Sequence, residues 1–338
     1  MTRNFDVIGI GNAIIDVIMP ATEADLARLG VSKGVMQLVE RPRADLLMAA
    51  TGADGARLSD SAHLVPGGAV ANTLDGLGRL GLSTGFIGRV ADDDLGLHYI
   101  AASEAAGTRF LCPATTREHL PTSRCIIMVT PDGERSMNTY LGISAELGED
   151  AVDEAAFAGG PWLFLEGYLF DKPAGKAAFL KAAEACRAEG GQAGIALSDP
   201  FCVDRHREDF RRLVAGPMDY VIGNSHEWQA LYQTTDLESA LAQARADCGT
   251  VICTCSGDPA ILIRGEERVT IPVDRVVPVD ATGAGDQFAA GLIFGLARGF
   301  PLAVAGRMGC IAAAEVITHF GARPETDVMG RFSIAGLV

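Results

Sequence analysis

The sequence is poor in positive charge. It contains 28 Lys and Arg against 43 Asp and Glu, which gives a net charge of −15 and a pI of about 4.8. A chain this acidic binds nucleic acid and anionic membrane surfaces poorly, so we expect neither as a partner. No apolar run approaches the roughly 20 residues that span a bilayer. The first residues carry one basic side chain and lead directly into a predicted strand, so we expect no signal peptide and a cytoplasmic protein.

Cysteine spacing argues against a metal centre. The eight cysteines form no C-x-x-C pair and no cluster with histidine, so we expect no zinc. We expect buried, reduced thiols instead. Cys253 and Cys255 flank Thr254 on a predicted strand, and we expect their thiols on opposite faces of it.

Strand-like and helix-like runs alternate along most of the 338 residues. Short apolar, β-branched runs predict buried strands, and longer periodic runs predict helices. The predicted strands are 5–11, 84–88, 162–166, 193–197, 220–223 and 250–254; the predicted helices are 69–80, 95–106, 174–188, 237–246, 282–297 and 302–318. The alternation predicts an α/β fold, a mostly parallel central sheet with helices on both faces. Ligands then bind beyond the carboxyl ends of the strands.

Two segments interrupt this alternation. The first lies at about 34–40, and the second spans about 108–140, where strand-like runs at 124–129 and 136–140 flank a Pro-Asp-Gly turn. Both predict strands outside the main sheet. No linker, repeat or low-complexity tract divides the chain, so we expect a single domain over 1–338 that carries these strands as insertions.

The segment 280–286, with the sequence DATGAGD, is the most informative part of the chain. Its small residues join an apolar, β-branched run to a helix-like run, so backbone N–H groups can face an anion with the helix dipole behind them. Asp286 adds a carboxylate in the first turn. An anion cradle with a base beside it suits phosphoryl transfer to a hydroxyl. The alternative interpretation is a tight turn capped by Asp.

A second Gly-rich turn, 66–73 with the sequence PGGAVANT, also leads into a helix. Together the two segments resemble the paired signatures of the ribokinase-like (PfkB) carbohydrate and nucleoside kinases. Segment 9–16 resembles the first strand and substrate-binding aspartate of that family, and 224–227 matches its N-x-x-E motif. Within the family, segments 134–136 and 197–201 are similar to adenosine kinases.

The resemblance implies a small β lid over the substrate and roles for individual residues. Asp286 is then the base that acts on a primary hydroxyl. Gly283, Ala284 and Gly285 stabilise the transferring phosphoryl group through their N–H groups, and the two glycines also contact the nucleotide. Arg135 reaches the phosphate when the lid closes, whereas by itself it is equally a solvated surface charge.

A second group of residues is expected around the sugar. Asp16 follows the first predicted strand, where it either caps a turn or accepts hydrogen bonds from two vicinal hydroxyls. The resemblance implies the second role, with Asn12, Gly67, Gly68 and Asn72 beside it. Asn12 alone is equally a turn former. Ala69 stands where adenosine kinases usually carry Ser.

The nucleotide side is less complete. Asn224 and Glu227 either form a capping box or, as the resemblance implies, orient Mg²⁺ through water, and both roles are compatible. Asn224 also belongs to the implied nucleotide site. Thr254 and Gly257 are the remaining candidates there, because only they survive from the T-x-G-x-x-G pattern of the family.

The resemblance thus implies an ATP- and Mg²⁺-dependent kinase of a ribose-type substrate, foremost adenosine, which becomes AMP. Tyr168 either stacks on the purine or packs in the core. Met36, Leu38 and Met137 are candidates to line an apolar slot for the base. One alternative is a sugar kinase for ribose, fructose or a 2-keto-3-deoxy acid, and another is a non-catalytic nucleoside- or sugar-binding protein. A monovalent cation, the preferred phosphoryl donor and the choice between monomer and homodimer stay open.

Overall fold

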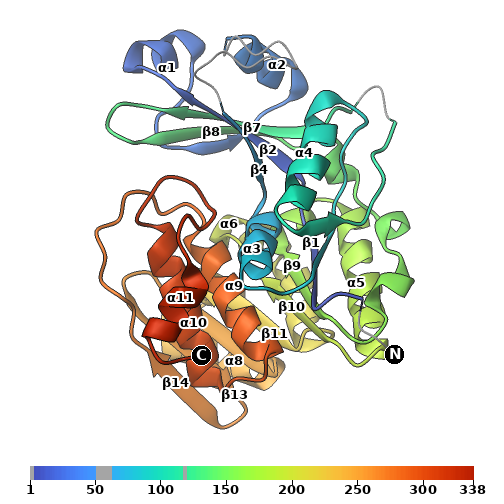
Figure 1. Ribbon diagram of the computed structural model, residues 1–338, viewed down its shortest axis with the longest axis vertical. Coiled ribbons are helices and arrows are strands. Elements are labelled where there is room, and N and C mark those ends of the chain that lie inside the picture. The colour runs from blue at the N-terminus through green and yellow to red at the C-terminus, as the bar shows by residue number, and fades with distance from the viewer. Residues whose placement is uncertain (1–3, 51–62, 117–119) are drawn as a thin grey trace.

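A computed structural model describes residues 4–50, 63–116 and 120–338. Its centre is a nine-stranded sheet, here called the large sheet (Figure 1). Strands β11 to β6 of this sheet pair in parallel, and only β12–β13 and β13–β14 are antiparallel. In sheet order the strands are β14 (Glu267–Ile271), β13 (Asp258–Arg264), β12 (Thr250–Cys255), β11 (Tyr220–Asn224), β10 (Gln192–Ala196), β9 (Trp162–Glu166), β1 (Val7–Ile10), β5 (Thr84–Ile87) and β6 (Thr108–Phe110).

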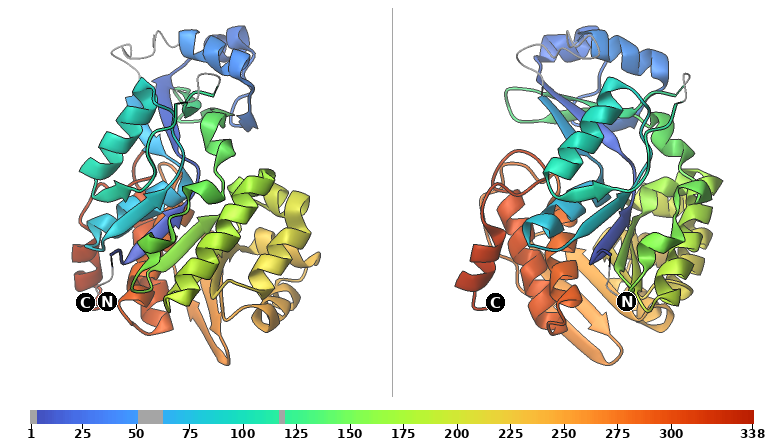
Figure 2. Two further views of the ribbon diagram at one scale, coloured as in Figure 1. Left: turned by 90° about the vertical axis from the view of Figure 1, so that its right-hand side faces the viewer. Right: turned by 45° about the vertical axis from the view of Figure 1, so that its right-hand side comes forward.

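Helices cover both faces of the large sheet (Figure 2). One face carries α3 (Ala69–Arg79), α4 (Asp94–Ala105), α9 (Ala284–Ala297), α10 (Leu302–Val316) and α11 (Val328–Ile334). The other carries α5 (Pro173–Ala188), α6 (Pro200–Ala215), α7 (Ser225–Tyr232) and α8 (Leu237–Asp247). Four short 3-10 helices cover Gly142–Glu146, Glu149–Ala151, Glu154–Phe157 and Gly167–Asp171. The predicted α/β fold class is confirmed.

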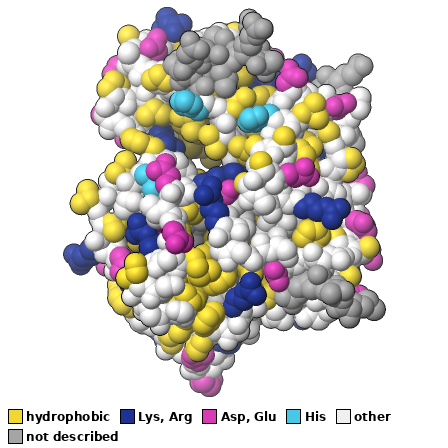
Figure 3. Space-filling model, in the orientation of Figure 1, with side chains coloured by type: hydrophobic (Ala, Val, Ile, Leu, Met, Phe, Trp, Pro, Cys, Tyr) yellow, Lys and Arg dark blue, Asp and Glu magenta, His cyan; other side chains and the backbone are white. Residues whose placement is uncertain are grey.

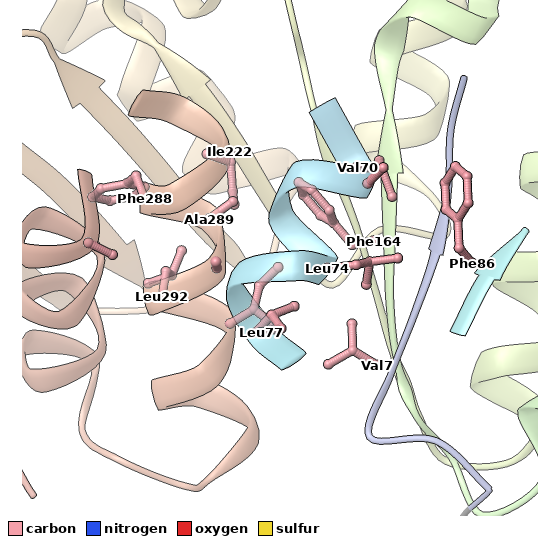
Figure 4. Close-up of a cluster of buried hydrophobic side chains, with 14 of the residues drawn as sticks. Val7, Val70, Leu74, Leu77, Phe86, Phe164, Ile222, Phe288, Ala289 and Leu292 are labelled. Atoms are coloured by element: carbon pink, nitrogen blue, oxygen red, sulfur yellow. The ribbon is translucent and has the colours of Figure 1, made fainter. Parts of the chain in front are cut away.

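Inner strands of the large sheet supply both cores, because successive side chains point to opposite faces. Phe164 of β9 packs with Leu74 and Phe288 on the α3 and α9 side, as Figure 4 shows. Its neighbours Leu163 and Leu165 join the core under α5 and α6. Full burial of one such side chain contributes about 1.5–3 kcal/mol. The strands therefore read as continuous apolar runs rather than alternating ones.

A second, five-stranded sheet, here called the small sheet, stands at one end of the large one (Figure 1). Its order is β3 (Met36–Leu38), β8 (Arg135–Tyr140), β7 (Ser123–Val129), β2 (Ile14–Pro20) and β4 (His63–Gly67). Helices α1 (Glu23–Leu29) and α2 (Arg41–Ala50) cover its outer face. The opposite, inner face of the small sheet is directed toward the carboxyl ends of the strands of the large sheet (Figure 1).

The predicted extent of the inserted strands needs two corrections. Thr108–Phe110 pairs in parallel with β5 in the large sheet, so the insertion does not begin at residue 108. The small sheet also includes β2 and β4, which were not predicted as strands. Pairing between β2 and β4 joins segments that are about 50 residues apart, which local periodicity does not reveal. No helix within 4–50, 63–116 and 120–338 is long and apolar enough to cross a bilayer.

Candidate active site

The segment 280–286 forms the start of α9, as predicted. Gly283 is the N-cap with a φ of 81°, and a Cβ there would lie 2.5 Å from the Cα of Ala322. Only glycine fits such a left-handed, crowded position. A Cβ on Gly285 would instead meet no atom within 4 Å. The N–H groups of the first turn have no partners within the helix, and the Ala284 N–H donates to the Ala281 carbonyl at 3.3 Å.

Asp286 is held against helix α3. The side-chain amide of Asn72 donates a hydrogen bond of 2.9 Å to its Oδ2, and the Thr73 hydroxyl donates one of 3.1 Å to its backbone carbonyl. Burial raises the pKa of Asp286 to about 7; the Asn72 bond opposes this effect, and the negative charge of Glu166 adds to it. A carboxylate with such a pKa is suited to accept a proton near neutral pH.

Asp16 lies within strand β2 rather than in a turn after a strand, so the turn-capping interpretation is wrong. Burial raises the pKa of Asp16 to about 7, opposed first by Arg323 and then by Arg135, while the charge of Asp286 raises it further. A Cβ on Gly67 would lie 2.4 Å from Oδ2 of Asp16. The glycine therefore leaves the room that this carboxylate occupies.

Gly68 and Asn12 lie against each other near Asp16. Gly68 has a φ of 100°, and a Cβ there would lie 2.2 Å from the backbone oxygen of Asn12. Asn12 is buried. Its amide donates to Oε1 of Glu166 at 2.7 Å and accepts from the Ser144 hydroxyl at 2.7 Å. These bonds give Asn12 a supporting position rather than that of an exposed turn former.

Arg135 connects the small sheet to the signature segment. Its guanidinium makes a 2.7 Å ion pair with Asp280, and both side chains are at most 10% exposed. Asp280 also accepts hydrogen bonds from the backbone N–H groups of Thr282 and Gly321. The interpretation of Arg135 as a solvated surface charge is wrong, because the side chain is buried against the start of α9.

Asn224 and Glu227 form the capping box of α7. Glu227 accepts from the Asn224 backbone at 2.8 Å, and Asn224 accepts from the Glu227 backbone at 2.9 Å. Burial raises the pKa of Glu227 to about 7. Thr254 pairs in register with Asn224 at the carboxyl end of β12, and Gly257 follows in the next turn, where no atom lies within 4 Å of an added Cβ.

Tyr168 is 38% exposed, and its hydroxyl donates to the Ser198 carbonyl at 3.2 Å. The interpretation of Tyr168 as a core residue is therefore wrong. Met36 and Leu38 lie on the edge strand of the small sheet, 47% and 56% exposed, and Met36 pairs in register with Met137. These three apolar side chains share the sheet face that carries Arg135.

A cavity of about 1020 Å³ lies between the small sheet and the loop before α11. Its walls include three predicted residues, Asp16, Asn72 and Arg135, with Ile18 and Val65 among the apolar ones. Met36, Leu38, Met137 and Tyr168 do not line it. The molecule is indented on the front face where the small sheet meets the body (Figure 3).

Comparison with known proteins identifies this arrangement. Residues 44–328 match the model of the pfkB family of carbohydrate kinases. The chain belongs to this family. Aminoimidazole riboside kinase of Salmonella typhimurium is 30% identical over 249 residues, 69% of this chain and 74% of that protein. A solved structure of a probable sugar kinase from Rhizobium etli CFN 42 is 38% identical, with a TM-score of 0.88 and full coverage of both chains. The adenosine kinase structure from Sinorhizobium meliloti is 37% identical, with a TM-score of 0.87, covering 98% of this chain and 99% of that one.

This PfkB kinase is a phosphotransferase with an alcohol group as acceptor, and its substrates are a sugar or nucleoside and ATP. Three of its polar residues were not among the predicted site residues. Glu166 ends β9 and accepts from the Val70 N–H at 3.2 Å; Asp280 binds Arg135. Arg323 donates to the Pro66 carbonyl at 2.7 Å.

A carboxylate at the carboxyl end of a buried strand was the one local signal available for Glu166. Arg323 had no local signal of this kind, because its partners Pro66 and Asp75 are about 250 residues away in the sequence.

Proposed function

We propose that this PfkB kinase transfers the γ-phosphate of ATP to the primary hydroxyl of a ribonucleoside, foremost adenosine, to form AMP. The observation that carries this proposal is the cavity beside Asp16. Its volume of about 1020 Å³ is at the upper end for ligand sites and exceeds what one sugar ring fills. The 37% identity to an adenosine kinase over 98% of the chain supports the same substrate.

Asp16 and the glycines beside it are proposed to bind the ribose. Two carboxylate oxygens suit two vicinal hydroxyls. Gly67 leaves the space that the Asp16 carboxylate occupies, and Gly68 allows close approach to the Asn12 backbone oxygen. The Asn72 side chain contacts both Asp286 and Arg323: its NH2 group donates to Asp286, and its amide oxygen accepts from Arg323 at 3.4 Å. The apolar walls of the cavity are then available to the base, where burial contributes about 25 cal/mol per Å².

Asp286 is proposed to take the proton of the primary hydroxyl as that oxygen attacks phosphorus. Asn72 fixes the orientation of the carboxylate, and the pKa of about 7 leaves much of it ionised at neutral pH. The N–H groups of Gly283, Ala284 and Gly285 are proposed to stabilise negative charge on the phosphoryl oxygens, with the Ala284 N–H exchanging the Ala281 carbonyl for phosphate. Arg135 is a further donor once it exchanges Asp280 for phosphate.

Asn224, Thr254 and Gly257 are proposed to contact the nucleotide, with Tyr168 as a stacking candidate for a purine. Within the described residues, no group of three or more His, Cys, Asp or Glu side chains is arranged to hold a metal ion. Mg²⁺ therefore fits through phosphate oxygens and water, with Asn224 and Glu227 orienting the waters. It supplies charge neutralisation on the phosphates when bound. Nothing in this arrangement supports a monovalent-cation requirement.

The test compares kcat/KM for adenosine, inosine, ribose and fructose under identical Mg-ATP. We expect adenosine to exceed ribose and fructose by ~10³, which corresponds to ~4 kcal/mol of transition-state binding. A ratio near or below one transfers the assignment to a sugar kinase, which the relative from Rhizobium etli favours by its description. No turnover on any of them, with tight binding retained, supports a non-catalytic binding protein.

A further inference from the structure

Two thiols lie side by side at the end of β12. The Sγ atoms of Cys253 and Cys255 are 3.8 Å apart. The expectation that they point to opposite faces was wrong, because positions i and i+2 of a strand share a face. The register with β13 also shifts between the two cysteines, where Pro259 and Ala260 lie opposite Thr254. Proline donates no ladder hydrogen bond, and such irregularities increase the local twist.

The two thiols differ in access. Cys253 is fully buried, whereas Cys255 is half-buried. The hydrogen bond from Cys253 lowers the pKa of Cys255 to about 7, opposed by burial and by Asp258. A thiol of this kind is partly thiolate at neutral pH, and the thiolate is the nucleophile. Cys112 is the other half-buried cysteine, and burial raises its pKa instead.

Thr254 stands between the two cysteines and pairs in register with Asn224. Both residues belong to the proposed nucleotide site. A disulfide needs an S–S distance of about 2 Å, so closure must pull the two sulfurs together by nearly half their present separation. The segment that carries both thiols includes Thr254 and leads into the turn with Gly257.

We propose that Cys253 and Cys255 form a dithiol site for hydroperoxides, and that its oxidation to a disulfide disturbs the nucleotide side of the kinase. In the first step the Cys255 sulfur attacks a peroxide oxygen. The O–O bond breaks, the alkoxide leaves as ROH with the thiol proton, and Cys255 becomes a sulfenic acid. In the second step the Cys253 sulfur attacks that sulfur, the S–O bond breaks, and the hydroxide leaves as water with the second thiol proton. Two thiols are oxidised, and ROOH is reduced to ROH and water.

The test treats the reduced full-length protein with hydrogen peroxide and maps its thiols by mass spectrometry after alkylation. We expect two of the eight thiols to disappear with a mass loss of two hydrogens, in a peptide that contains both Cys253 and Cys255. Cys253→Ser should leave a sulfenic acid at Cys255 that dimedone traps, and Cys255→Ser should block the reaction. Cys112→Ser is the matched control and should react as the parent protein does.

Kinase activity provides the second measurement. The oxidised protein should lose turnover with Mg-ATP, and a thiol reductant should restore it, whereas Cys255→Ser should keep its activity through the peroxide treatment. A disulfide at another cysteine, or both thiols still free, overturns the proposal; a disulfide with unchanged activity overturns its effect on the nucleotide side. The effect on activity rests on the proposed function, but the mass measurement does not, so the two can fail separately.

Discussion

The two carboxylates of the proposed site have the same pKa but different neighbours. Asp16 on the small sheet and Asp286 on α9 both have a pKa of about 7 because burial disfavours their charge. Asp16 faces two cations, Arg323 and Arg135, that oppose this effect. Asp286 faces the neutral amide of Asn72 and the negative charge of Glu166. A shared pKa therefore does not imply a shared role.

The difference separates binding from chemistry. A carboxylate with cations nearby is stabilised as an anion and suits hydrogen-bond acceptance from hydroxyls. Asp286 instead lies in the first turn of α9, beside the N–H groups proposed to bind the phosphoryl group, and is therefore the carboxylate proposed to act as the general base. The comparison predicts that substitutions at Asp286 act on kcat, whereas substitutions around Asp16 act on substrate binding.

Asp286→Asn should lower kcat by ~10²–10⁴, because it removes the proton acceptor and keeps the size of the side chain. Nucleotide affinity should change little. Steady-state kinetics together with ATP binding by calorimetry provide the check. Turnover within a few-fold of the parent protein would exclude Asp286 as the base and leave it as an acidic residue of the first turn of α9.

Asp16→Ala should lower kcat/KM for the nucleoside by at least about a hundredfold, since two hydrogen bonds to a charged acceptor, each worth roughly 1.5–3 kcal/mol, are lost. Asp16→Asn is the control, because it keeps the shape and one acceptor. A 2′-deoxy or 3′-deoxy substrate should lose less in Asp16→Ala than the full riboside does. An unchanged KM for the riboside contradicts the assignment.

Arg323→Gln should move the acid limb of kcat/KM to higher pH by about one unit, because the largest effect that lowers the pKa of Asp16 is removed. Activity should therefore fall at pH 7 and recover at higher pH. Arg323→Lys keeps the charge and should keep the limb in place. The acid limb of kcat, which reports Asp286 in the enzyme–substrate complex, should keep its position. An equal shift of the acid limbs of kcat and kcat/KM argues against separate roles for Asp16 and Asp286.

Gly67→Ala and Gly285→Ala form a matched pair. The first places a methyl group 2.4 Å from Asp16, so KM for the riboside should rise by about tenfold or more. The second places it in open space, so the free energy of unfolding should stay within about 0.5 kcal/mol. Reduced activity of Gly285→Ala at unchanged Tm would show that the space beside α9 is occupied during turnover.

Asp286→Asn should also raise stability at pH 8, by about 1 kcal/mol or about 2 °C in Tm. The carboxyl has a higher pKa in the folded protein than in the unfolded chain, so the folded protein binds its proton more tightly. Stability then falls as pH rises from about 4 to about 7, and the amide avoids this loss. The gain should vanish at pH 4. If the Asp286→Asn variant and the parent protein have equal Tm values at pH 4 and at pH 8, the raised pKa of Asp286 is contradicted.

Local sequence patterns predicted the fold well. The apolar run of β9 and the periodic pattern of α9 each identify an element of the large sheet or its cover, because burial on both faces leaves a continuous signal. The run 14–18 was different, since a single Asp within an apolar stretch looks like a turn. Its place in the small sheet depends on pairing with β4 and β7, which sequence separation hides.

Among the candidate site residues, those whose conformation the sequence displays most directly are defined by local backbone shape. Gly283 and Gly68 occupy left-handed positions that the sequence displays as Gly-rich turns. Arg323 acts through contacts with residues about 250 positions away, so its charge carries no local signal. Asp280 opens the predicted segment 280–286, but its ion pair with Arg135 depends on a distant strand. Cys253 and Cys255 were misjudged for a different reason, an error about which strand positions share a face.

In the free protein, Asp280 competes with phosphate for the guanidinium of Arg135. A phosphate that recruits this guanidinium, as proposed, must first displace a buried carboxylate from a distance of 2.7 Å. The measured affinity for a phosphorylated ligand is then the difference between two contacts rather than the strength of one. Product that leaves can be replaced at once by the protein's own anion, so the same pair that weakens capture also favours release.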